Sequence, residues 1–166
     1  VELSDIMERV PDDETPLIVL FDGVTDVRNF GAIARTAECA GVDAIVVPAH
    51  GSAAINDDAI KSSSGALLRI PVCREDNLKT VINYAKQSGM QVCAATEKSS
   101  TPYTQVDFSL PTLLIMGAEG SGVSNEYLKM CTAKAKLPML GEVESLNVSV
   151  AAGVFMYEVL RQRGIL

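Results

Sequence analysis

The chain has 166 residues, enough for one domain with a buried core. Hydrophobic residues make up 48% and charged residues 21%, which excludes a disordered chain, and no apolar run approaches the roughly 20 residues of a membrane span. The net charge of −7 argues against broad nucleic-acid binding by this domain, because phosphate contacts need clustered Lys and Arg.

The first 16 residues are polar and acidic and end in Pro16. This composition predicts a linker-like segment or a short surface helix ahead of a folded domain over residues 17–166. The N-terminus lacks the basic start and apolar stretch of a signal peptide. We therefore expect a cytoplasmic protein that does not contact a membrane.

From Leu17 onward, apolar runs alternate with stretches of helical periodicity. The predicted strands cover residues 17–21, 44–47, 69–73, 90–95, 112–116 and 133–137. The predicted helices cover residues 30–40, 57–67, roughly 77–89, 125–130 and 146–163. Asp26 or Asn29 caps the first, which Gly41 ends, and Asp76 caps the third, which runs to Gly89. This alternation predicts an α/β fold with a mostly parallel sheet and helices on both faces. In such sheets, ligands bind at the carboxyl ends of the strands.

The four cysteines do not have the spacing of a metal site. Cys39, Cys73, Cys93 and Cys131 form no CxxC pair, and His50 lies near none of them in the sequence. We therefore expect no metal. Each cysteine lies in or beside an apolar stretch, which favours a buried thiol.

The first of three polar stretches joins the first strand to its helix, over residues 22–31. Arg28 and Arg35 are seven residues apart, so they lie on nearly the same face of a helix. Arg35 also interrupts a run of small and apolar residues. It is therefore either paired with an acid for structural reasons or directed into a functional site.

The second stretch, residues 116–124, also follows a strand and contains three glycines. Gly117 and Gly122 have the spacing of a phosphate-binding loop, but Val123 stands where that loop needs a lysine. Glu119 suits an amine, a hydroxyl or an arginine better than a phosphate. The alternative is a glycine-rich surface turn.

The third stretch, residues 137–153, leads into the last helix. Ser145 is a good N-cap for that helix. Capping does not explain Asn147 and Ser149, because polar side chains in the first turns of an apolar helix need partners. Ser145, Asn147 and Glu119 could all supply directed hydrogen bonds without adding positive charge.

These three stretches, in this order and spacing, resemble the SpoU/TrmH branch of the SPOUT RNA methyltransferases. The resemblance extends over roughly residues 17–163 and implies a C-terminal trefoil knot, which ordinary folds avoid. It also implies S-adenosyl-L-methionine as the cofactor, a ribose 2′-hydroxyl of tRNA or rRNA as the methyl acceptor, and a homodimer. Many members carry an N-terminal RNA-binding domain, whereas only residues 1–16 precede Leu17 here. Val27 replaces a proline that is common in the first motif.

Matched position by position, the resemblance assigns two sets of site residues. Those for the cofactor are Thr96, Gly117, Leu137, Met139 and Leu146. Those for catalysis are Asn29, Arg35, Glu119, Ser145 and Asn147, and Arg28 and Arg35 are candidates for RNA contact. Arg35 either removes the proton of the 2′-hydroxyl or stays charged and stabilises the developing alkoxide; a guanidinium rarely gives up its proton.

Two other functions stay open at this point. One is methylation of a base, instead of a ribose, by an enzyme of the same class. The other is an RNA-binding module without catalytic activity. The sequence does not say which RNA or which nucleotide is modified.

Overall fold

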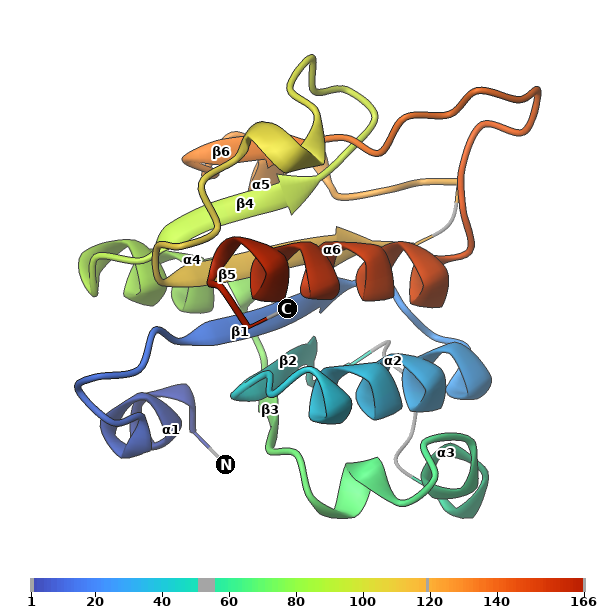
Figure 1. Ribbon diagram of the computed structural model, residues 1–166. Coiled ribbons are helices and arrows are strands. Elements are labelled where there is room, and N and C mark those ends of the chain that lie inside the picture. Colours follow the sequence, from blue (N-terminus) through green and yellow to red (C-terminus); the bar gives the residue numbers. More distant parts are fainter. Residues whose placement is uncertain (1, 51–55, 119, 166) are drawn as a thin grey trace.

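Six parallel strands form one sheet with helices on both faces in the computed structural model, which describes residues 2–50, 56–118 and 120–165 (Figure 1). The strands are β1 (Leu17–Asp22), β2 (Ala44–Pro48), β3 (Val72–Glu75), β4 (Gln91–Ala95), β5 (Thr112–Gly117) and β6 (Ala133–Ala135). Their order across the sheet is β3-β2-β1-β5-β4-β6, and every neighbouring pair is parallel. The predicted parallel α/β fold is therefore confirmed.

The helices are α1 (Leu3–Arg9), α2 (Val27–Cys39), α3 (Asp57–Ser62), α4 (Leu78–Gln87), α5 (Asn125–Leu128) and α6 (Val148–Gln162), with 3₁₀ turns η1 (Ala66–Leu68) and η2 (Tyr103–Gln105). β1 is apolar on both faces because each face meets a helical layer. Val19 and Phe21 pack with residues of α2 and α6, whereas Ile18 and Leu20 pack with residues of α1 and α4.

Several predicted boundaries shift in the structure. Asn77, not Asp76, caps α4, because the Asn77 side chain accepts the Lys79 N–H. The helix expected over residues 57–67 divides into α3 and η1, since Gly65 adopts a left-handed backbone with φ of 82° between them. β3 begins at Val72, three residues later than predicted.

The N-terminal segment takes part in the core. It forms α1, whose Leu3 and Ile6 are each only 4% exposed. Both side chains belong to the same buried cluster as Ile18 and Leu20 of β1, and α1 contacts β2. Of the two predicted alternatives, a linker-like segment and a short surface helix, the segment contains the short helix, and two of its apolar side chains are buried in the core.

α6 is held against the connection between β4 and β5. The Phe155 ring makes edge-to-face contacts with Tyr103 and Phe108. The Arg163 guanidinium donates hydrogen bonds to four backbone carbonyls, at 2.8–3.2 Å, contributed by Thr15, Pro16, Phe108 and Leu110. The end of the last helix is thereby tied to the start of β1 and to the segment before β5. The trefoil knot stays a prediction from the resemblance.

The cysteines follow the expectation of buried thiols with one exception. Cys73 and Cys93 are buried, and burial raises the pKa of Cys73 to about 11 and that of Cys93 to about 12. Cys131 is half-buried, with a pKa of about 11 for the same reason. The prediction was wrong for Cys39, which is exposed because it lies on the outer face of α2.

In the described part of the chain, no helix is both long and apolar enough to span a membrane.

Candidate functional site

A cavity of about 190 Å³ opens at the carboxyl ends of β4 and β5. This position adjoins the boundary between β1 and β5, where the strand order changes direction, which is the usual ligand site of an open parallel sheet. The residues that line it come from three connections and one helix face: Ala95, Thr96, Glu97, Met116, Gly117, Ala118, Gly120, Gly122, Leu137, Met139, Glu144, Ser145, Leu146, Val148, Ala151 and Phe155.

All five residues that the resemblance assigns to the cofactor line this cavity. They are Thr96, Gly117, Leu137, Met139 and Leu146. Periodicity alone could not bring them together, because they follow three different strands. Among the catalytic candidates, Ser145 also lines the cavity. Glu119 lies outside the described residues.

One wall of the cavity is a tight glycine loop after β5. A Cβ atom added at Gly117 would lie 2.1 Å from the carbonyl carbon of Gly122, so only glycine fits there. The Gly122 N–H donates to the Ala118 carbonyl at 2.8 Å, which closes the turn. Backbone groups therefore form this wall, and a ligand can approach them closely.

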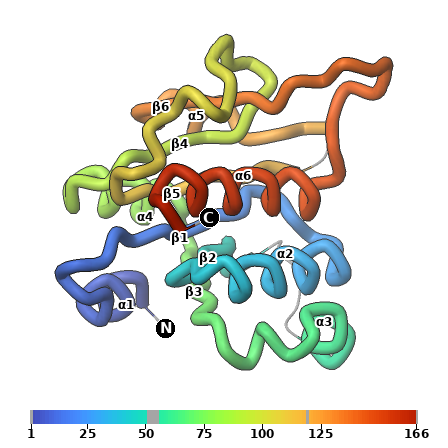
Figure 2. The backbone as a smooth tube through the Cα atoms, in the orientation of Figure 1, coloured from blue at the N-terminus to red at the C-terminus, as the bar shows by residue number. Residues whose placement is uncertain are grey.

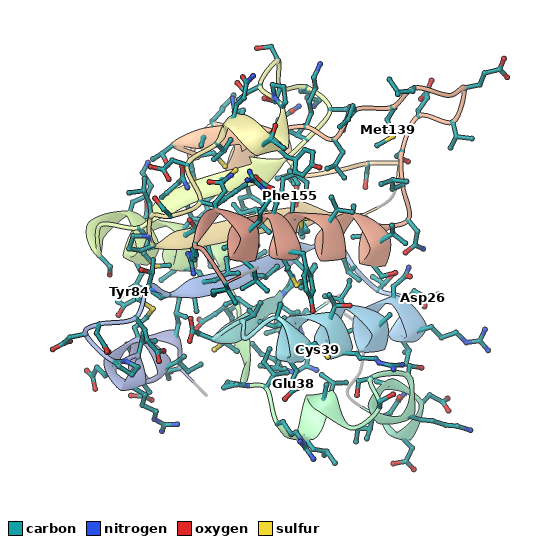
Figure 3. All side chains as sticks on the ribbon, viewed as in Figure 1. Asp26, Glu38, Cys39, Tyr84, Met139 and Phe155 are labelled. Carbon is teal, nitrogen blue, oxygen red and sulfur yellow. The ribbon has the colours of Figure 1, made fainter. Side chains whose placement is uncertain are left out.

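The opposite wall is formed by residues 137–147, which leave the sheet after β6 and return to the start of α6 (Figure 2). Its residues Leu137, Met139 and Leu146 contribute apolar side chains to the cavity, and Phe155 lines the cavity from α6. In Figure 3, Met139 lies above the start of α6, and Asp26 lies at the nearby start of α2.

The charges described around the cavity are negative. Glu97 and Glu144 are the charged side chains among its described lining residues. Apolar walls combined with carboxylates suit a ligand with a flat apolar part and a positively charged part. S-adenosylmethionine has both, in its adenine ring and its sulfonium, so the residues present fit this cofactor.

A side-chain hydrogen bond joins the first and third polar stretches. The Asn147 side-chain amide donates to Asn29 Oδ1 at 3.2 Å, although the two residues are 118 positions apart. Asn29 lies in the first turn of α2, which Asp26 caps by accepting the N–H groups of Arg28 and Asn29. The prediction that Asp26 or Asn29 caps this helix is thus confirmed for Asp26.

Asn147 also explains the polar residues at the start of α6. Its Oδ1 accepts the Ser149 N–H at 2.9 Å and the Ser149 hydroxyl. Asn147 is therefore the N-cap, and the prediction that Ser145 caps the helix was wrong. The helix begins two residues later than expected, which leaves Ser145 free of the capping role and on the cavity wall.

Arg28 and Arg35 are both exposed on α2 and lie outside the cavity lining. Within the described residues, neither makes a salt bridge. Among the residues that the structure describes, a structural ion pair therefore does not account for Arg35. α2, which carries both arginines, lies side by side with α6, and α6 contributes Val148, Ala151 and Phe155 to the cavity (Figure 1).

Within the described residues, no group of three His, Cys, Asp or Glu side chains is arranged to hold a metal ion.

The resemblance noted from the motifs extends to whole-domain comparisons. The model of the SpoU rRNA Methylase family matches residues 16–157. A relative from Pseudomonas aeruginosa named 23S rRNA (guanosine-2'-O-)-methyltransferase RlmB is 42% identical over 97% of this chain and 64% of its own length. A putative TrmH family tRNA/rRNA methyltransferase from Staphylococcus saprophyticus is 36% identical over 95% of this chain. The chain thus spans 64% of the length of both relatives.

Solved structures share the fold. The SpoU methyltransferase AviRb from Streptomyces viridochromogenes, in complex with AdoMet, superposes with a TM-score of 0.84 at 31% identity, over 95% of this chain and 64% of that one. A TrmH/SpoU tRNA modifying enzyme from A. aeolicus superposes with a TM-score of 0.83 at 34% identity, over 97% of this chain and 82% of that one.

Proposed function

Because this chain belongs to the SpoU rRNA Methylase family, we propose that it transfers a methyl group from S-adenosylmethionine to a ribose 2′-hydroxyl of RNA. The observation that carries the proposal is the cavity at the ends of β4 and β5, where all five residues assigned to the cofactor meet. An AdoMet complex among the solved relatives of the same fold supports the choice of cofactor.

The proposed substrate is a guanosine of 23S rRNA, which is what the RlmB relative is named for. A tRNA is the second candidate, because the A. aeolicus relative is a tRNA modifying enzyme and matches most of its own length. We further propose a cytoplasmic homodimer in which a separate RNA-binding domain adds to the affinity of this domain for RNA. The chain's charge of −7 supports this need for added RNA affinity.

Bound S-adenosylmethionine supplies an electrophilic methyl carbon on a positively charged sulfur. The residues of this chain then hold the acceptor in line, since orientation provides much of the rate in such a displacement. The exposed guanidinium of Arg35 grips the RNA phosphate beside the target ribose. As the 2′-hydroxyl oxygen takes the methyl group, its proton would pass to water, the S–CH3 bond would break to release the neutral thioether S-adenosylhomocysteine, and Arg35 would stabilise the negative charge that develops on the oxygen.

The remaining polar residues orient these groups. The hydrogen bond between Asn29 and Asn147 ties the start of α2, which carries Arg35, to the start of α6 beside the cavity. Ser145 lies on the cavity wall, where its hydroxyl can contact the ribose or the cofactor. Glu119 is proposed to orient the reacting groups, as the resemblance implies. Arg28 adds a second phosphate contact, about two helical turns before Arg35 on nearly the same face of α2.

The activity is tested with methyl-labelled cofactor and 23S rRNA that lacks the modification. After nuclease digestion, label in a 2′-O-methylated nucleotide supports the proposal, and label in a base identifies a base methyltransferase instead. Absence of cofactor binding by calorimetry identifies an inactive RNA-binding module. The same assay with unmodified tRNA distinguishes the two substrate candidates.

Replacing Arg35 with lysine tests its role. Arg35→Lys keeps the positive charge but loses the planar, two-pronged donor geometry, so we expect turnover to fall by about 100-fold or more, with unchanged cofactor affinity. Arg28→Lys is the matched control on the same helix face and should alter mainly the KM for RNA. Near-normal turnover of Arg35→Lys on its true substrate would refute the role of this arginine.

A further inference from the structure

Asp22 holds both ends of the glycine loop that forms one wall of the cavity. It is the last residue of β1 and is paired in register with Gly117 at the end of β5. Its backbone carbonyl accepts the Ala118 N–H at 3.1 Å. Its carboxylate Oδ2 accepts the Ser124 N–H at 2.8 Å and the Ser124 hydroxyl at 2.6 Å. One residue therefore fixes the loop where it leaves β5 and where it enters α5.

Between these two anchors the chain doubles back on itself. Ala118 and Gly122 form an isolated antiparallel bridge, and Gly120 and Gly122 adopt left-handed backbones with φ of 81° and 66°. Such glycine-rich segments have many accessible conformations when nothing restrains them. The hydrogen bonds that Asp22 accepts therefore restrict this segment at both of its ends.

The carboxylate of Asp22 is not among the groups that line the cavity, whereas four residues of the loop are. Its influence on a bound ligand must then pass through the loop. Burial and the nearby charge of Asp22 together raise the pKa of the Tyr127 hydroxyl in α5, the helix that Ser124 precedes.

On this geometry we infer that Asp22, acting through Ser124, is a positioning residue for S-adenosylmethionine that holds the 117–124 loop ready for the cofactor. The inference rests on the proposed function for the identity of the ligand. Hydrogen bonds to a carboxylate are about twice as strong as neutral ones. A loop that is ordered before binding costs the ligand less conformational entropy, so it binds more tightly.

This role predicts a specific kinetic pattern. Loss of the restraint should raise the Kd and KM for the cofactor while leaving kcat at saturating cofactor within about twofold, since the bound loop still reaches the same conformation. A purely structural role would instead lower the melting temperature with no change in cofactor affinity. A role in placing the catalytic helix α2, which follows Asp22 in the chain, would lower kcat.

The test measures cofactor Kd by calorimetry, steady-state KM and kcat, and melting temperature on the full chain. Asp22→Ala should raise the Kd by about tenfold or more, and Asp22→Asn by less, because an amide oxygen still accepts one weaker hydrogen bond. Ser124→Ala removes only the hydroxyl donor and should raise the Kd by about threefold. Ser88→Ala, at an exposed serine after α4 that does not line the cavity, is the matched control and should change nothing.

The outcomes separate this inference from the proposed function. If Asp22→Asn and Ser124→Ala bind the cofactor as tightly as the native protein, or lose kcat alone, the positioning role is overturned even if Asp22→Ala fails to fold. If the native protein binds the cofactor but methylates no RNA, the proposed activity fails and the binding measurements still decide the role of Asp22. If the native protein binds no S-adenosylmethionine, both are overturned.

Discussion

The two walls of the cavity are built in opposite ways. The described residues of the glycine loop, 117–118 and 120–124, form a compact turn fixed at both ends by Asp22 and closed by a backbone hydrogen bond. Across the cavity, residues 138–146 are all exposed and make no hydrogen bond within the described part of the chain. Leu140 is 98% exposed and Val143 is 77% exposed. The cavity thus combines a wall that is set before binding with one held only at its ends.

This difference indicates which wall loses more conformational entropy when a ligand binds. The glycine loop presents backbone groups whose positions barely need to change, whereas the 137–147 segment has to be ordered when a ligand arrives. Ligand binding should therefore restrict the second wall far more than the first. Substitutions should be severe in the glycine loop and mild in the opposite segment, unless a side chain reaches the cavity.

The largest effect is expected at Gly117. In Gly117→Ala, the new methyl group meets the backbone of Gly122 and Val123 at 2.1–2.3 Å, so the loop must open. We expect cofactor affinity to fall by at least about 100-fold by calorimetry, since the clash involves backbone and relieving it displaces the cavity wall. Gly141→Ala is the matched control in the other wall, where nothing lies within 4 Å of the added atom. Equal losses in both variants would contradict the comparison.

An intermediate effect is expected at Met139. This side chain lines the cavity and is 37% exposed, whereas its neighbour Leu140 does not line it. Met139→Ala should weaken cofactor binding by about 1 kcal/mol, roughly fivefold, because it removes part of an apolar contact. Leu140→Ala should leave the affinity unchanged. A larger loss for Leu140→Ala would show that the exposed part of this wall closes over the ligand.

The smallest effect on cofactor binding is expected at Asn147, because this residue mainly stabilises the point where the second wall joins α6. Asn147→Ala removes the cap of α6 and the hydrogen bond to Asn29. We expect a loss of about 1 kcal/mol in the free energy of unfolding, measured by thermal denaturation. Asn83→Ala, an exposed position within α4, is the control and should be close to neutral. If Asn147→Ala were as stable as the native protein, the second wall would not depend on this anchor.

The sheet and its cavity edge could be predicted from the sequence because each buried strand is a short apolar run followed by a polar βα turn. Helix caps were harder to place. Ser145 and Asn147, or Asp76 and Asn77, are equally good caps by residue type, and the choice depends on where the first helical turn begins and which side chain accepts its N–H groups.

Long-range pairs could not be predicted. The bond between Asp22 and Ser124 joins positions 102 residues apart, and sequence periodicity carries no information about such a pair. In the sequence, Asp22 and Gly23 only begin the polar stretch that joins the first strand to its helix. The burial of Leu3 and Ile6 was missed for a related reason, since their partners lie on strands and helices that follow later in the chain.

The hydrogen bonds of Arg163 have a consequence for how this protein folds. They join the end of α6 to Pro16 and Thr15, which precede Arg163 by 147 and 148 positions in the chain. Such distant contacts form slowly because a long loop must close first. α6 also supplies Val148, Ala151 and Phe155 to the cavity and is synthesised after every described strand. A nascent chain on the ribosome therefore carries the whole sheet before it can bind a ligand, and the cavity is completed only when Arg163 has emerged and docked.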